Sequence, residues 1–185
     1  MFKSKTVFIR LKSFFLLITA FLVFSSAISA QSRDHLTEAE GELIREFQEL
    51  DKRMEIYVKA IDRRFLVLNN DNSQAKQVEK DKEKWGELPK GTRGELLRDI
   101  EKILQEAIDK IDDVAERDAK NELLPISVHI LADGAKRFLP QLKSFQDTTK
   151  ESKELGTIYG AIDFSNQVIE ASAKVPRETK KKKKS

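Results

Sequence analysis

The sequence predicts an all-α protein: an antiparallel four-helix bundle whose first helix is long. Apolar residues recur in alternating steps of four and three along several long segments, which is typical of packed helices. No segment shows the two-residue alternation of a strand. The 185 residues contain only four prolines and seven glycines, so few helix breaks are expected. The alternative arrangement is a three-helix bundle with one long, kinked helix.

Residues 1–30 predict a secretory signal peptide. Four basic residues and no acidic residue precede an uncharged apolar run, Phe14 to Ala30, whose last third is rich in small residues. We expect cleavage near Ala30 and export to the periplasm or the extracellular space. The alternative is an uncleaved anchor, because the run has about the minimum length of a membrane-spanning helix. The chain has no cysteine, so the exported domain must be stable without disulfides.

Charge divides the rest of the chain into a body, residues 31–175, and a tail, residues 176–185. The body carries 24 basic and 30 acidic residues, whereas the tail carries six basic residues and one acidic residue. The body is long enough to form one helical domain with a sizeable core. Its acidic balance argues against a nucleic-acid partner, because nucleic-acid-binding faces are basic. Because residues 177–185 lack apolar side chains, we expect the tail to be disordered.

The tail is the candidate polyanion-binding segment. Its charge is concentrated in five consecutive residues, Lys180, Lys181, Lys182, Lys183 and Lys184. A lysine close to an anionic membrane surface contributes about 1 kcal/mol, and the contribution is screened by salt. We therefore expect weak association with an anionic membrane surface; the alternative is a solvated end without a partner.

The long first helix is predicted at residues 36–68. Thr37 and Glu40 have the spacing of a capping box at its start, and the turn-forming residues 69–72 end it. The core face repeats in steps of four and three through Leu43, Phe47, Leu50, Met54, Tyr57 and Ile61.

The start of this helix also carries a short resemblance. Its residues Leu36-Thr37-Glu38-Ala39-Glu40 resemble the Leu-Thr-x-x-Gln motif of helical periplasmic stress chaperones, with glutamate in the last place. The resemblance covers five residues, and an ordinary helix cap explains them equally well. It implies a binding role and assigns no site residue.

Three further helices are predicted after a connection at residues 69–92, whose middle forms a short polar helix. A second capping box, Thr92 with Glu95, begins a helix that runs to about Asp118. The third helix has Pro125 in its first turn, and we expect Pro140 to kink or restart it. A turn near residues 147–150, capped by Thr148 and Glu151, leads to the fourth helix. The core face of this last helix is predicted at Leu155, Tyr159, Ile162 and Ile169.

The candidate metal site is an acidic stripe on the second helix. Carboxylates on one helix face suit Ca²⁺ or Mg²⁺, but no glycine-centred calcium loop accompanies them, which favours a solvated surface. Asp99 and Glu106 begin the stripe, and its candidate metal ligands are Asp109, Asp112, Asp113 and Glu116.

Sequence motifs for catalysis are absent: the chain has no glycine-rich phosphate loop, no GxSxG and no HExxH. Met54 and His129 are not expected to bind haem, because methionine is ordinary filler in a core repeat. We therefore expect no cofactor and predict a non-enzymatic, exported helical bundle that binds a protein partner or has a structural role in the cell envelope. The alternatives are a carboxylate-based metal-binding protein or enzyme and a membrane-tethered adaptor. Gly156 and Gly160 predict a close helix contact within the chain or the seam of a homodimer.

Overall fold

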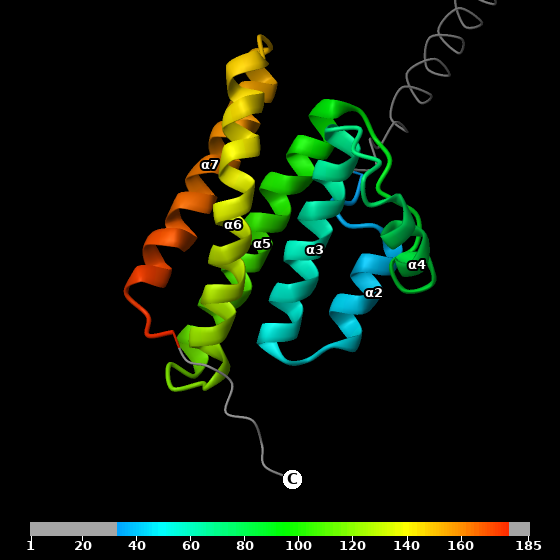
Figure 1. Ribbon diagram of the computed structural model, residues 1–185. Helices are drawn as coiled ribbons and strands as arrows, with labels where there is room; N and C mark the ends of the chain where they lie inside the picture. The colour runs from blue at the N-terminus through cyan, green and yellow to red at the C-terminus, as the bar shows by residue number, and fades with distance from the viewer. Residues whose placement is uncertain (1–32, 178–185) are drawn as a thin grey trace, which may run out of the picture. The chain divides into compact units, whose positions relative to one another are not determined.

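The computed structural model describes residues 33–177, which are helical and contain no strand. This confirms the all-α prediction, but the described residues form more helices than the predicted four (Figure 1). The predicted signal peptide, residues 1–30, and residues 178–185 of the predicted tail lie outside the described residues. The helices are α2 (Glu38–Glu46), α3 (Leu50–Leu68), α4 (Ala75–Trp85), α5 (Arg93–Arg117), α6 (Leu123–Thr148) and α7 (Ser152–Ala173).

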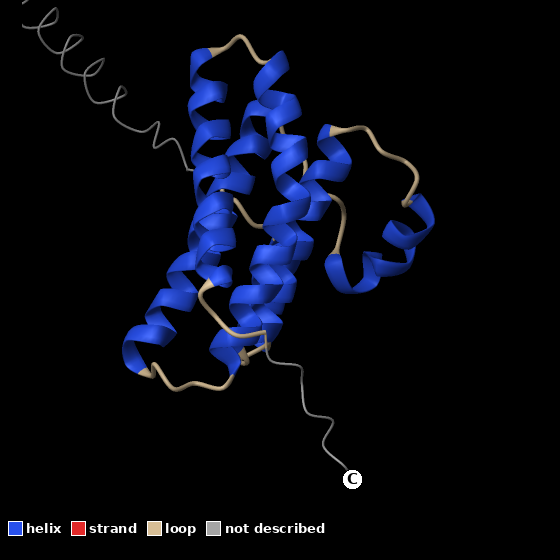
Figure 2. Ribbon diagram, turned by 60° about the vertical axis from the view of Figure 1, so that its left-hand side comes forward, coloured by secondary structure: helices blue, strands red, loops and turns tan. Residues whose placement is uncertain are grey.

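The four longest helices lie side by side and enclose the core (Figures 1 and 2). Helix α3 packs against α5 and α6, and α7 packs against the same two helices. Later residues of α3 pair with earlier residues of α5, so these two helices are antiparallel. Later residues of α3 pair with later residues of α6, so α3 and α6 run in the same direction. None of the helices described has the length and apolar character of a membrane span.

The predicted long first helix is wrong: residues 36–68 form two helices, α2 and α3. They are separated at residues 47–49, where Phe47 has an extended backbone (φ −90°, ψ 121°). The carbonyl of Phe47 accepts a hydrogen bond from Arg53 Nε at 2.8 Å. No glycine or proline occurs at the break. Its cause is tertiary: α2 folds back because buried Glu40 pairs with Arg64 of α3.

Aromatic and aliphatic side chains from the four long helices form one core. The Phe65 ring on α3 stacks on the rings of Phe138 and Phe145 of α6, with centroids 5.5 and 6.1 Å apart. The predicted apolar faces of α3, α5 and α6 all contribute to this core. Its fully buried members include Met54, Ile61, Ile100, Leu104, Leu131 and Leu142.

Of the four residues predicted for the core face of α7, Ile162 is buried, Leu155 and Ile169 are half-buried, and Tyr159 is exposed. Tyr159 is 50% exposed, so its predicted core position is wrong. The buried face of α7 combines branched side chains with the short side chains of alanine and serine, and Tyr159 lies outside this face. The buried residues of α7 are Ile158, Ala161, Ile162, Ser165, Val168 and Ser172.

Local sequence signals set most helix ends. Both predicted capping boxes are present, at the starts of α2 and α5. Helix α6 ends at Thr148 and α7 begins at Ser152, so the turn lies within two residues of the predicted one, although Glu151 makes no side-chain cap. The predicted restart at Pro140 is wrong, because α6 continues through this exposed position. Buried side chains before and after the proline hold both halves of α6 on the core.

Glycines on α6 and α7 differ in how much space surrounds them, which gives a test of the packing. A Cβ atom at Gly134 would lie 2.8 Å from Val58 Cγ2, whereas a Cβ at Gly156 would meet nothing within 4 Å. We expect Gly134→Ala to lower the free energy of unfolding by about 1–3 kcal/mol. Gly156→Ala should raise it by about 0.5–1 kcal/mol, because alanine favours an open helix position. Urea unfolding measures both, and equal effects would contradict this packing.

Candidate functional site

The residues of the predicted acidic stripe do not share one exposed surface. Its predicted metal ligands, Asp109, Asp112, Asp113 and Glu116, are exposed near the C-terminal end of α5. Partial desolvation and the like charges of the other three carboxylates raise the pKa of Asp112, although its side chain is exposed. Within residues 33–177, no group of three or more acidic or histidine side chains is placed to hold a metal ion. Asp99 and Glu106, also assigned to the stripe, instead face α3 and belong to a different cluster.

Arg64 is the centre of that cluster, and it fastens the N-terminal arm, defined as residues 34–46, to α3 and α5. Its guanidinium is 1% exposed and pairs with Glu40 through Nη1 and Nη2, each at 2.9 Å. Nη2 also donates to the carbonyl of His35 at 2.6 Å. Arg64 Nε lies 3.7 Å from the carboxylate of Asp99 on α5, which is an ion-pair distance and too long for a hydrogen bond.

Arg63 connects the same cluster to the end of α4. Its Nε lies 3.4 Å from Glu40 Oε1, and its Nη1 donates to the carbonyl of Trp85 at 2.8 Å. Nη2 donates to the carbonyls of Gly86 and Glu87. Burial lowers the pKa of Arg63, and the charge of Glu40 opposes this shift. The buried carboxylate of Glu40 therefore faces both arginines. Arg64 also bonds to the backbone of the arm, and Arg63 bonds to the backbone at the end of α4.

A second set of contacts holds the start of the arm. Glu106 of α5 lies between His35 Nε2 and the hydroxyl of Tyr57, which donates to it; each distance is 2.7 Å. His35 Nδ1 lies 3.4 Å from Asp34. The hydrogen bond to His35 lowers the pKa of Glu106, and burial opposes the shift. Burial of Tyr57, together with its bond to Glu106, raises the pKa of the tyrosine hydroxyl.

The lowered pKa of Glu106 predicts a loss of stability in acid. A carboxyl group whose pKa is lower in the folded state stabilises the fold above its unfolded pKa, and this contribution is lost as the pH falls through the folded pKa. We expect wild type to exceed Glu106→Gln in stability above about pH 5 and this difference to shrink towards pH 3. Urea unfolding at several pH values measures the difference. The same difference at pH 6 and pH 3 would contradict the assignment.

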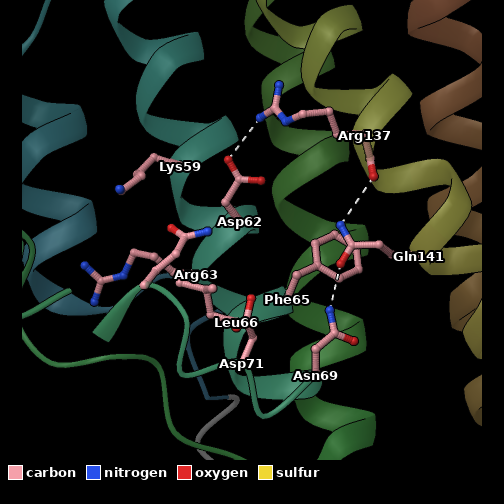
Figure 3. A pocket seen from close by; sticks show the side chains of 10 residues that line it. Lys59, Asp62, Arg63, Phe65, Leu66, Asn69, Asp71, Arg137 and Gln141 are labelled. Atoms are coloured by element: carbon pink, nitrogen blue, oxygen red, sulfur yellow. Dashed lines mark hydrogen bonds and ion pairs between the residues drawn. The ribbon is translucent and has the colours of Figure 1, made fainter. Parts of the chain in front are cut away.

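A polar groove lies beside this cluster, between α3, α6 and the segment that leads to α4 (Figure 3). Its volume is about 310 Å³. Arg137 Nη2 donates to Asp62 at 3.0 Å, and Asn69 donates to Gln141 at 2.7 Å, so polar side chains of α6 and α3 pair across it. Lys59 forms an ion pair with Asp81 of α4. The other lining residues are Arg63, Phe65, Leu66, Asp71 and Gln74.

The last described residues form a C-terminal strap, residues 174–177, that lies against α6. His129 Nε2 donates to the carbonyl of Val175 at 3.0 Å. The guanidinium of Arg177 pairs with Asp133, one turn further along α6. His129 therefore has a structural partner at the point where the chain leaves α7.

The sequence patterns did not reveal the roles of Arg63 and Arg64, the ion pairs that Glu40 makes besides its capping box, or the pairing of Glu106 with Tyr57. One signal could have indicated them: Arg64 follows Tyr57 by seven residues, and Asp99 precedes Glu106 by seven, so each pair occupies one helix face. Comparisons with protein-family models, curated proteins and solved structures found no match to this chain.

Proposed function

We propose that this protein is an exported, non-enzymatic helical protein that binds in the cell envelope and carries a basic tail for weak attachment to an anionic surface. The helices α3, α5, α6 and α7 would be its four-helix bundle, with α2 and α4 packed outside. The observation that supports this function best is the C-terminal strap. Val175 and Arg177 contact α6 just before the lysine run, which supports a tail that continues from the surface of the body.

A binding role agrees with how the buried charged side chains are used. Glu40, Arg63 and Arg64, which are buried, pair with one another or with backbone carbonyls. These interactions hold the arm on the helices, so the three buried charges have structural partners within the fold. An acidic body with a basic tail would orient the protein on an anionic surface, with the body held away from it. A separate protein partner would then bind the body.

Export is the second part of the proposal. The basic start and apolar run of residues 1–30 support it. The intact mass of the protein recovered from cells is the test. A mass that lacks about thirty residues supports cleavage near Ala30. The full-length mass would support the membrane-tethered adaptor instead.

The tail predicts salt-sensitive binding to anionic vesicles. We expect the exported protein to sediment with phosphatidylserine vesicles at about 20 mM salt and to lose most of this binding by about 150 mM, because the attraction is screened. A variant with Lys180–Lys184 replaced by glutamine keeps the chain length and should not bind. Neutral phosphatidylcholine vesicles are the control. Equal binding by both proteins, or binding by neither, would contradict the proposed role of the tail.

A further inference from the structure

We infer that the N-terminal arm can dock on a second copy of this chain, so that the protein forms a dimer by exchanging residues 34–46. In this dimer, residues 47–49 become helical and join α2 to α3 in one continuous helix. The site on α3 and α5 where the arm binds is called the seat. In the dimer, the arm of each copy occupies the seat of the other copy. The inference rests on the hinge and on the seat.

The hinge is the first argument, because its sequence favours a helix. Phe47, Gln48 and Glu49 include no glycine or proline, and glutamine and glutamate are good helix formers. The apolar repeat of α3 also continues through the hinge to Phe47 and Leu43. Local sequence and tertiary structure therefore favour different backbones at these three residues. A short hinge in such a conflict is a recognised route to exchange between copies.

Side-chain contacts from α3 and α4 keep residues 47–49 out of the helical conformation in the monomer. Arg53 Nε donates to the carbonyl of Phe47, and its Nη2 donates to the side chain of Gln48 at 3.3 Å. The ammonium of Lys84 lies 5.3 Å from the centre of the Phe47 ring. These contacts are on or near the surface, where hydrogen bonds and ion pairs contribute little. The hinge can therefore straighten once the arm leaves its seat.

The seat is specific enough to select the arm of a second copy. It offers buried Arg64 to Glu40 and half-buried Glu106 to His35, and Leu43 is 5% exposed when it is seated. An identical arm makes the same contacts, so exchange conserves the buried ion pairs. The two copies donate arms reciprocally, which gives a closed two-fold dimer. The continuous helix over residues 38–68 would be about 46 Å long and would carry the arm away from its own body.

Two substitutions at one position test the hinge directly. Glu49 has φ −69°, a value that proline adopts readily, whereas in the continuous helix Glu49→Pro would remove a backbone hydrogen bond and clash with the preceding turn. Glu49→Ala removes the same side chain and favours the helix. The full-length proteins are expressed, exported and purified, and the dimer dissociation constant is measured by sedimentation equilibrium. Circular dichroism confirms that both variants are folded.

The exchange predicts opposite effects for the two variants. Glu49→Ala should dimerise about twofold to threefold more tightly than wild type, because each dimer contains two hinges. Glu49→Pro should weaken the dimer at least about a hundredfold. Equal dissociation constants for the two variants would overturn the inference, since a dimer formed through another surface would not respond to the hinge. Glu49→Ala that stays monomeric up to about 1 mM would also overturn it.

Discussion

Arg64→Ala is expected to lower the free energy of unfolding by about 3–5 kcal/mol, which is the usual cost of removing one partner from a buried ion pair. Arg64 is 1% exposed and faces two buried carboxylates, Glu40 at 2.9 Å and Asp99 at 3.7 Å. Without the guanidinium, Glu40 would lose a hydrogen bond and an ion pair, Asp99 would lose its ion pair with Arg64, and the carbonyl of His35 would lose its donor. Urea unfolding followed by circular dichroism measures the change.

An apolar replacement of Arg64 and its two carboxylates is the matched control for Arg64→Ala. The triple variant Glu40→Met, Arg64→Leu, Asp99→Leu removes these three charges together, and such replacements are often neutral or stabilising. Arg63 keeps its hydrogen bonds to the carbonyls of residues 85–87 in this variant. We expect the triple variant to recover most of the stability that Arg64→Ala loses. A loss below about 1 kcal/mol for Arg64→Ala would place the arginine on the surface and contradict the buried cluster.

Phe138→Ala is expected to lower the free energy of unfolding by about 3–5 kcal/mol, because it removes a buried ring and leaves a cavity. Phe138 is fully buried on α6 and stacks on Phe65 of α3 with ring centroids 5.5 Å apart. This stack is part of the contact between the two helices, and Gly134 lies one turn away where α6 meets Val58. Thermal and urea unfolding both report the loss.

Tyr159→Ala is the matched control for Phe138→Ala, since it also truncates an aromatic side chain in a helix. Tyr159 is half exposed on α7, so we expect its truncation to change stability by less than about 0.5 kcal/mol. The two substitutions should therefore differ at least about fivefold in free energy. Equal losses would show that α7 faces the core with the tyrosine side, as the sequence pattern predicts.

Short-range signals predicted much of the fold. The capping boxes at Thr37 and Thr92 were predictable because each needs only a side chain and a backbone amide three residues away. The helix from Thr92 to about Asp118 was predicted nearly to its bounds, Arg93–Arg117. These features depend on neighbours within one or two turns of helix, which a sequence displays directly.

Contacts between distant residues were not predictable in the same way. The break at Phe47 has no local breaker, and it exists because Glu40 pairs with Arg64, 24 residues further along the chain. Asp99 was assigned to a solvated stripe because a carboxylate on a charged helix is usually exposed. Its burial depends on an arginine from α3 that no pattern within α5 reveals.

Hydrogen exchange of the amides of α2 tests most directly the claim that buried charges hold the N-terminal arm. Glu40→Gln keeps the shape of the side chain but removes the charge that faces Arg63 and Arg64. Local opening exposes amides without global unfolding. We predict that the α2 amides lose at least about tenfold more protection than the slowest amides of α6, because charged hydrogen bonds contribute about 1.5–3 kcal/mol. Equal changes in α2 and α6, or no change in α2, would contradict the claim.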